Sequence, residues 1–204
     1  MNLDELLQMV GRRPRGPRPF FTAAHVLRAV QLVAERPVSR RELAERLKIG
    51  EGSVRTILSV LRKAGLVDVV RAGVRLSEAG RQLLREMDRR LSPGVQIPAG
   101  RSTVDLHNVA IVVKGGGHRV SSGVEQRDAA MAVGSSGAST FVCQGGRLIF
   151  PGMATDMETL DPAGSERVKS ILEIEEGDAL VIGSARDVDR AHLGAIAAAL
   201  TLLT

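Results

Sequence analysis

Residues 38–91 carry two short apolar repeats of helical spacing, separated by a break and followed by two β-branched runs, and this order limits the fold more than any other feature. Ser39 and Glu42 have the spacing of a capping box, which predicts a short helix from Ser39 to about Leu47. The run 48–50 then interrupts the helical pattern. A second helix is therefore expected to start in a new direction directly after the first.

This second helix is expected to begin at Ser53 and to end at Gly65, since glycine favours the left-handed conformation that closes a helix. Val54, Ile57, Leu58 and Leu61 fall at i, i+3, i+4 and i+7, which predicts one buried face. The opposite side carries hydroxyl, guanidinium and ammonium groups, from Ser53, Arg55, Thr56, Ser59, Arg62 and Lys63. Such groups donate hydrogen bonds to phosphates and to base edges.

A β-hairpin is predicted next, by the two β-branched runs of LVDVVRAGVRL. Gly73 is expected at its tip, and Arg71 and Arg75 on its exposed parts. Ser77 is then expected to cap a further helix that runs to about Leu91. The hairpin therefore lies between two helices.

Apolar residues of helical spacing in 23–33 predict the first helix of a three-helix core. The whole segment resembles the winged-helix family of prokaryotic transcription regulators, through RELAERLKIGEGSVRTILSVLRKAGLV and RAGVRLSEAGRQLL. In that family the second helix of the pair enters the DNA major groove, and the hairpin, or wing, reaches neighbouring backbone or minor groove. The resemblance implies an all-α winged helix-turn-helix domain with a small β-wing over residues 22–91. Its implied DNA-binding residues are Arg40, Ser53, Arg55, Thr56, Ser59, Arg62, Lys63, Arg71 and Arg75.

A basic, proline-rich stretch, GRRPRGPRP, lies within residues 1–21, which we interpret as an N-terminal arm and lead-in. Prolines favour an extended chain, and the arm would carry Arg12, Arg13, Arg15 and Arg18 along it. Such an arm could follow a phosphate backbone or lie in a minor groove. The alternative is a solvated lead-in that packs Phe20 and Phe21 onto the core.

Charge is divided unevenly between the two halves of the chain. Residues 1–102 hold 20 Lys and Arg against 10 Asp and Glu, a net charge of +10, whereas residues 103–204 hold 8 against 13, a net charge of −5. A basic half of this kind is typical of a protein region that meets a polyanion. The asymmetry therefore favours DNA contact by the N-terminal half.

The amino-acid composition argues against several classes of protein. The chain has no Trp or Tyr and only four Phe, which disfavours single-stranded nucleic acid because such modules stack bases on aromatic rings. Its single cysteine, Cys143, excludes an intramolecular disulfide. No stretch resembles a secretion signal or is long enough to span a bilayer. A cytoplasmic protein without a membrane partner is expected.

A second domain is predicted over residues 104–204, after a Pro- and Gly-rich linker at 92–103. Its expected strands are 109–114, 138–143, 147–150 and 178–183, and its expected helices follow a Ser122–Glu125 capping box, the Asp161-Pro162 pair, and a cap at Ser184 or Asp187. The order β-α-β-β-α-β with an added helix suggests an α+β two-layer sandwich of ferredoxin-like type. A three-layer α/β domain is the alternative.

Three features of this domain are candidate ligand contacts. The loop Gly115, Gly116 and Gly117 lacks the residues of a phosphate-binding loop, yet its backbone N–H groups could meet an anion, although a plain flexible loop explains it as well. Gln126, Arg127 and Asp128 crowd one helix start, as ligand contacts or as a salt-bridged subunit contact. Ser184 lies at another helix start, where capping alone would explain it.

No catalytic or metal-binding motif is present. The four histidines show no ligand spacing with Cys143, and Cys143 is expected to be a small buried strand residue. We therefore expect no cofactor, no metal and no enzymatic activity.

The two halves together resemble an uncharacterised archaeal family in which a winged helix precedes a small α/β domain of unknown function. The matching residues are GVEQRDAAMAVGSSGASTFVCQGGRLIFPG, at 123–152. The resemblance implies the two-domain layout and no particular ligand.

These features predict a transcription regulator whose winged helix binds double-stranded DNA and whose C-terminal domain dimerises, senses a small-molecule effector, or does both. Two-fold DNA sites favour a homodimer, and the last helix, with Leu193, Ile196, Leu200 and Leu203, could form the contact or simply pack on the sheet. One alternative is a metabolic enzyme domain with an autoregulatory winged helix. Another is a winged helix used for protein–protein assembly.

Overall fold

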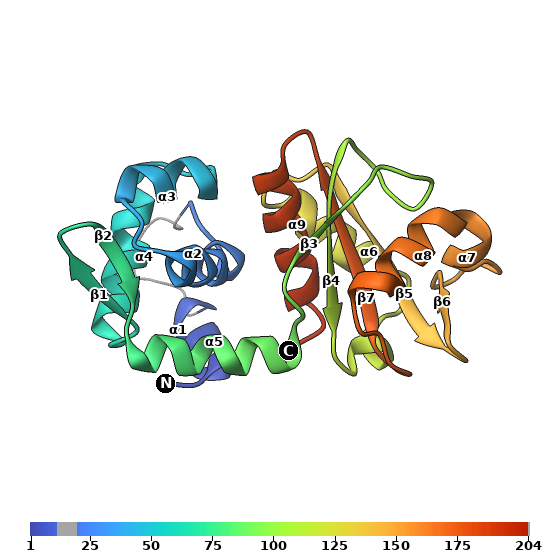
Figure 1. Ribbon diagram of the computed structural model, residues 1–204, viewed down its shortest axis with the longest axis horizontal. Coiled ribbons are helices and arrows are strands. Elements are labelled where there is room, and N and C mark those ends of the chain that lie inside the picture. The colour runs from blue at the N-terminus through green and yellow to red at the C-terminus, as the bar shows by residue number, and fades with distance from the viewer. Residues whose placement is uncertain (12–19, 204) are drawn as a thin grey trace. The chain divides into compact units, whose positions relative to one another are not determined.

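The computed structural model describes residues 1–11 and 20–203, and it divides the chain into two compact units, Met1–Asp88 and Arg89–Thr204 (Figure 1). The first unit is mainly helical and the second combines helices with a five-stranded sheet. The predicted two-domain organisation is therefore confirmed. No helix in the described ranges has the length and apolar character needed to cross a membrane.

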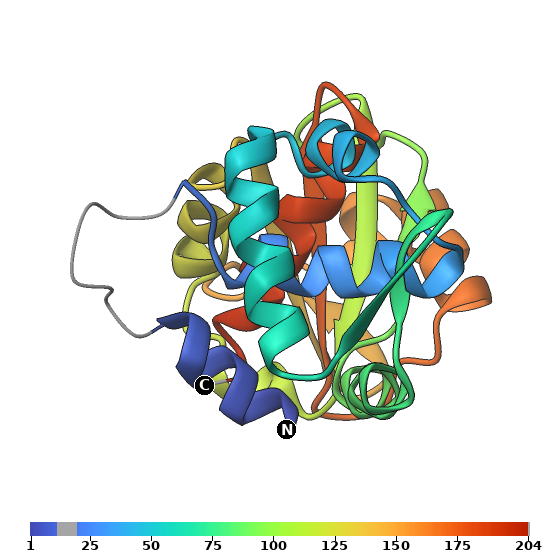
Figure 2. The same ribbon diagram turned by 90° about the vertical axis from the view of Figure 1, so that its left-hand side faces the viewer.

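The N-terminal unit contains the predicted helices and hairpin in the predicted order, and one further helix, α1, precedes them. The elements are α1 (Leu3–Gly11), α2 (Ala23–Glu35), α3 (Arg40–Leu47), α4 (Glu51–Lys63), the hairpin β1 (Val67–Val70) and β2 (Gly73–Leu76), and α5 (Glu78–Arg90). In Figure 2 the axis of α4 runs across that of α2, with the hairpin beside them. Their buried side chains include Val26, Leu27, Leu43, Ile57 and Leu61, each at most 1% exposed. Burial stabilises each such side chain by about 1.5–3 kcal/mol.

Two of the predicted helix caps are present. The Ser39 hydroxyl accepts a hydrogen bond from the Glu42 backbone N–H (3.2 Å), and the Ser77 hydroxyl accepts one from the Gly80 N–H (3.0 Å). The Glu42 carboxylate does not complete the capping box with Ser39, because it pairs with Arg36. The α3 cap is thus only half of the predicted motif.

The start of α4 differs from the prediction. The helix begins at Glu51 with Gly50 as its N-cap, so Ser53 lies inside the first turn. Lys48 closes α3 in the left-handed conformation (φ 55°), which turns the chain early enough for Gly50 to lead into α4. A glycine cap has no side chain to signal the helix start. Gly65, with φ 70°, ends the helix as predicted.

The predicted arm also contains structure. Its first residues form α1, in which Leu3 and Leu6 are fully buried. The Leu3 N–H donates to a carboxylate oxygen of Glu86 on α5 (3.1 Å). Residues 1–11 are therefore part of the N-terminal unit, whereas Arg12, Arg13, Arg15 and Arg18 lie outside the described residues.

The hairpin is joined to the rest of the unit by a third strand segment. Val38 forms an antiparallel bridge with Val74, and the two residues exchange both backbone hydrogen bonds (2.9 Å each). The turn at the tip consists of Arg71 and Ala72, so Gly73 is the first residue of β2 rather than the tip. The wing is thus a short three-stranded element that positions Arg71 at its end.

The C-terminal unit contains the strands β3 (Val95–Ile97), β4 (His107–Val113), β5 (Gly137–Gln144), β6 (Arg147–Ile149) and β7 (Ala179–Ala185). The other elements are a 3-10 turn η1 (Gly116–Arg119), α6 (Val124–Met131), α7 (Met157–Leu160), α8 (Pro162–Ile171) and α9 (Val188–Leu200). The strand order is β3-β4-β7-β5-β6, and all neighbours are antiparallel. Strand β3 lies in the segment that the sequence predicts as a linker.

Helices cover both faces of this sheet (Figure 1). On one face Val168 of α8 and Met157 of α7 join the core cluster that contains Phe141, Leu180 and Ile182. On the other face α9 lies against β7, where Gly183 meets its backbone. All residues of β7 are buried, as expected for a strand covered on both sides. The prediction that this domain combines helices with one sheet is confirmed, and its layers are those of the three-layer alternative.

The two-layer ferredoxin-like topology is wrong for this sheet. Strand β7 lies between β4 and β5 as their direct hydrogen-bonded neighbour. The order of elements along a chain does not specify which strands pair, since pairing depends on contacts between distant residues.

One helix start in this unit, that of α6, differs from the prediction, whereas the starts of α9 and α8 agree with it. Helix α6 begins after Gly123 (φ 77°), so Ser122 and Glu125 do not form its capping box. Helix α9 is capped by Asp187, whose carboxylate accepts from the Arg190 N–H (3.0 Å). Ser184 belongs to strand β7 instead. The Asp161-Pro162 start of α8 is confirmed, with Asp161 as the cap.

Candidate nucleic-acid interface

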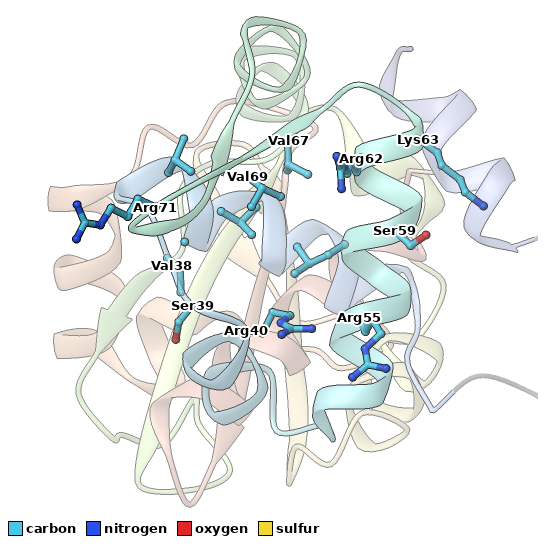
Figure 3. Close-up of a pocket in the computed structure, with 14 residues that line it drawn as sticks. Val38, Ser39, Arg40, Arg55, Ser59, Arg62, Lys63, Val67, Val69 and Arg71 are labelled. Carbon is cyan, nitrogen blue, oxygen red and sulfur yellow. The ribbon is translucent and has the colours of Figure 1, made fainter.

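An open groove of about 830 Å³ lies between α4 and the hairpin (Figure 3). Its walls come from the outer side of α4, from β1 and β2, and from the chain that enters α3. The lining residues are Val38, Ser39, Arg40, Arg55, Leu58, Ser59, Arg62, Lys63, Val67, Val69, Val70, Arg71, Gly73 and Val74.

Five of these residues are cationic and none is acidic: Arg40, Arg55, Arg62, Lys63 and Arg71. Their side chains make no hydrogen bond or ion pair with any residue in 1–11 or 20–203. Other arginines of the same unit are neutralised, for example Arg41 by Glu45 and Arg81 by Glu78. The groove therefore concentrates positive charge without a counterion from residues 1–11 or 20–203.

The buried side of α4 sets the direction of these side chains. Val54, Ile57 and Leu61 are fully buried and fix the rotation of the helix about its axis. Helical periodicity then directs Arg55 and Arg62, which are seven residues apart, to the same outer side. In Figure 3 Arg55 lies beside Arg40 at one end of the groove, while Arg62 lies near Val67 of the hairpin at the other.

The floor of the groove is apolar. Val38, Leu58, Val67 and Val74 contribute to it, and Val69 on β1 is 64% exposed. The aliphatic stems of arginine and lysine can lie on such a surface while their charged ends reach outward. The groove thus combines a hydrophobic base with cationic side chains.

The structure brings six of the predicted DNA-binding residues into one groove, namely Arg40, Arg55, Ser59, Arg62, Lys63 and Arg71. It does not bring the other three there. Ser53 is half-buried, and the Thr56 hydroxyl donates to the Gly52 carbonyl (3.2 Å). Arg75 is paired in register with Asp68, whereas the next pair is Val69 with Val74, which lines the groove. Successive residues of a strand point to opposite faces, so Arg75 lies on the face of the hairpin away from the groove. The valine floor has no separate sequence signal, because β-branched residues are expected in any strand.

The glycine loop of the C-terminal unit packs against its own domain. The Gly115 N–H donates to the Asp178 carboxylate (2.8 Å), and the Gly117 N–H donates to the Gly177 carbonyl (2.8 Å). A Cβ on Gly116 would lie 2.8 Å from a methyl group of Val113. The glycines therefore permit a close turn, and two of their three N–H groups already have partners.

The other predicted ligand residues lie in different surroundings. Gln126 is buried, and its amide nitrogen donates to the Thr201 hydroxyl (2.6 Å). Arg127 and Asp128 are exposed and pair with each other (2.8 Å). None of these three side chains lines the groove between α4 and the hairpin.

Ser184 is fully buried at the opposite end of β4 from the glycine loop, since it pairs in register with Asn108. Its hydroxyl donates to the Asn108 side chain (2.6 Å) and accepts from the Val104 N–H (3.1 Å). The predicted ligand residues therefore do not form one site.

Burial also raises the pKa of the Cys143 thiol, which disfavours the thiolate. Within the described ranges, no three His, Cys, Asp or Glu side chains are grouped as metal ligands would be.

The comparisons with known proteins match the two units separately. Residues 23–91 match the family model described as the CggR N-terminal DNA binding domain. Residues 104–202 match a family described as a domain of unknown function, DUF4443. The N-terminal unit is thus similar to a DNA-binding regulator domain, as its groove and charge suggest.

A solved structure resembles most of the chain. It is a hypothetical protein from Pyrococcus horikoshii OT3, with 28% sequence identity and a TM-score of 0.73. The similarity covers 89% of this chain and 92% of the other. None of the curated proteins matches this chain. The two-unit layout therefore recurs in an archaeal protein that is described only as hypothetical.

Proposed function

We propose that this protein is a transcription regulator that binds double-stranded DNA through the groove between α4 and the hairpin. The observation that carries the proposal is a set of five cations along one groove, none of them paired with another described residue, in a unit that matches a DNA-binding domain. Each cation that neutralises a phosphate releases a condensed counterion, which favours binding. The outer side of α4 would enter the major groove, with Arg71 at the wing tip beside the adjacent backbone.

Duplex DNA is the favoured nucleic acid. Recognition of single strands relies on aromatic side chains that stack on bases, and this chain has no Trp or Tyr. An exposed helix flanked by a short hairpin fits the width of the B-DNA major groove instead.

The test is a fluorescence-anisotropy titration of the full-length protein with a labelled duplex at several salt concentrations. Wild-type affinity should fall steeply between about 50 and 200 mM salt. Arg62→Ala should weaken binding to all sequences and reduce the slope of log K against log[salt] by about 0.9.

Arg41→Ala is the matched control, because it removes one positive charge from an exposed arginine of α3 outside the groove. It should leave the affinity and the salt slope nearly unchanged. Absence of duplex binding at low salt, or equal effects of the two variants, would contradict the proposal.

We further propose that the regulator is a homodimer without enzymatic activity. Its C-terminal unit would form the dimer contact. The support is geometric, since regulators with one reading helix per chain commonly bind two-fold symmetric sites as dimers. The contact is not expected from α9, because Leu193 and Ile196 are at most 1% exposed within the chain. Sedimentation equilibrium with and without duplex would test it, and a monomer in both conditions would exclude a dimer.

Effector sensing is a weaker second role for this unit. Gln126 and Ser184 already bind partners inside the domain, so a small molecule would have to compete with those contacts.

A further inference from the structure

We infer that Arg55 reads a guanine base and that the preferred DNA site contains a G·C pair beneath the N-terminal half of α4. The inference rests on the proposed function, because it presupposes that α4 lies in a major groove. It assigns base recognition to one residue of the groove and phosphate contact to the others.

The first step is the set of side chains that α4 exposes. They are Glu51, Arg55, Thr56, Ser59, Arg62 and Lys63, together with Gly52, which has none. Arginine binds the O6 and N7 atoms of guanine in a bidentate manner, whereas adenine is read in that manner by Asn or Gln. Helix α4 has no Asn or Gln. Its bidentate recognition is therefore limited to guanine.

The second step is the position of Arg55 along the helix. In helix-turn-helix proteins the N-terminal part of the recognition helix contacts the base edges. Arg55 lies in the second turn, whereas Arg62 and Lys63 lie in the last turn. The seven residues from Arg55 to Arg62 span about 10.5 Å along the helix axis, or about three base steps along a strand. Arg62 therefore reaches a different part of the duplex from Arg55.

The third step is the surroundings of Arg55. Its guanidinium has no partner among the described residues, and it lines the same groove as Arg40, which comes from α3 (Figure 3). At the other end Arg62 lies by the hairpin, whose tip carries Arg71. Cations on α3 and on the wing flank the helix that reads the bases, where the phosphate backbones pass. Arg40 and Arg71 accordingly hold phosphates, as do Arg62 and Lys63 in the last turn of α4, and Arg55 remains for the base.

The experiment is a binding selection from a random duplex library with the full-length protein and two variants. Wild type should enrich a site with guanine at one fixed position, and replacement of that G·C pair should weaken binding about 5- to 150-fold. Arg55→Gln should change the preference at this position from guanine to adenine, because glutamine pairs with the N6 and N7 atoms of adenine. Arg62→Gln should weaken binding to all sequences and leave the selected site unchanged.

Each result has a distinct meaning. Arg55→Gln with adenine at the fixed position, or with the preference lost at that position alone, supports the inference. If Arg55→Gln selects the same site as wild type, or if Arg62→Gln changes the selected site, the inference is overturned. The proposed binding to duplex DNA is not affected by either result. If wild type binds no duplex in the salt titration, the proposed function fails as well. Circular dichroism of both variants verifies the fold, since Arg55 and Arg62 are exposed.

Discussion

Gly73 lies so close to Val38 that a Cβ atom on Gly73 would be 2.5 Å from the Val38 carbonyl oxygen and 2.7 Å from its carbonyl carbon. The glycine also has φ 134°, which L-residues with side chains rarely adopt. This contact holds the hairpin against the segment that precedes α3. The position of the wing thus depends on the absence of one side chain.

Gly73→Ala should lower the free energy of unfolding by about 1–3 kcal/mol, because the new methyl group meets backbone atoms and the backbone conformation is strained. The urea midpoint of the far-ultraviolet circular dichroism signal measures this loss, since the chain has no Trp or Tyr for fluorescence.

Gly52→Ala is the matched control for this substitution. Gly52 is in α4, has an ordinary helical φ, and has no atom within 4 Å of the place that a Cβ would take. Alanine there should stabilise the helix by about 0.5–1 kcal/mol. Equal losses in the two variants would show that the Val38 contact does not govern the wing.

His25 makes the N-terminal unit sensitive to acid. It is 5% exposed, and its Nδ1 atom accepts a hydrogen bond from the Thr22 N–H (3.1 Å) at the start of α2. Burial lowers the pKa of His25 from 6.5 to about 4, so the folded protein keeps the imidazole neutral where the unfolded chain protonates it. Above pH 6.5 His25 is neutral in both states and does not change the free energy of unfolding. As the pH falls from 6.5 toward 4, the unfolded chain binds a proton that the folded protein does not, and the free energy of unfolding decreases.

His25→Gln should therefore flatten the dependence of stability on pH between 6.5 and 4. The difference from wild type should reach at most about 3 kcal/mol at the acidic end. Glutamine keeps an acceptor for the Thr22 N–H, as in the usual capping box. Urea unfolding at pH 7 and at pH 4.5 measures the effect, with His118→Gln, at an exposed histidine, as the control. Parallel pH profiles for wild type and His25→Gln would contradict this explanation.

Asp161 and Ser102 form a buried pair in the C-terminal unit. The Asp161 carboxylate accepts from the Ser102 hydroxyl (2.6 Å), from the Ser102 N–H (3.1 Å) and from the Gly164 N–H (3.1 Å). Burial disfavours the charged form, but the hydrogen bonds from Ser102 and Gly164 outweigh it and lower the pKa of Asp161. The pair thus connects the segment before β4 with the start of α8.

Ser102→Ala should destabilise the protein by about 1.5–3 kcal/mol at neutral pH, because it removes a hydrogen bond to a charged group. Stability from Asp161 is present above its unfolded pKa of 3.8 and disappears as the pH falls through the lower folded value. The deficit of the variant should therefore shrink below about pH 4. Ser121→Ala, at an exposed serine, is the control in the same urea experiments. If the stability difference between Ser102→Ala and wild type stays constant below about pH 4, the charge on Asp161 does not contribute to it.

The N-terminal unit could be predicted well because its signals are local. Ser39, Ser77 and Gly65 each act within a few residues of a helix end. Helix α1 has the same signal as α4, since Leu3, Leu6, Leu7 and Val10 fall at i, i+3, i+4 and i+7, yet the neighbouring prolines favour an arm. The groove itself could be predicted only in part, because its valine floor forms when Val38 meets β2.

The C-terminal unit shows the limit of such reasoning. Local composition predicts most of its strands, but β7 pairs with β4 and β5, which are distant in sequence. Polar residues that the sequence suggests as ligand contacts there form hydrogen bonds inside the domain instead. Ser184 pairs with Asn108 across the sheet, and no local pattern announces that partner.

Gln126 offers a direct test of whether its buried amide has a structural or a binding role. It is 1% exposed and donates to Thr201, while its carbonyl oxygen has no hydrogen-bond partner among the described residues. The Thr201 hydroxyl also donates to the Ala198 carbonyl (2.7 Å), so it stays satisfied without Gln126.

Gln126→Met should therefore change the free energy of unfolding by less than about 1.5 kcal/mol, because it keeps the volume and removes an unpaired polar group. Gln126→Ala should cost about 2–4 kcal/mol, since it leaves a cavity at a buried position of α6. Comparison of the two variants separates the loss of packing from the loss of hydrogen bonding. The urea midpoint measures both. A loss above about 3 kcal/mol in Gln126→Met would mean that the amide oxygen has a partner of its own, such as a buried water or a retained ligand. Native mass spectrometry of wild type and Gln126→Met would then distinguish these two, because only a retained ligand adds a discrete mass that the variant loses.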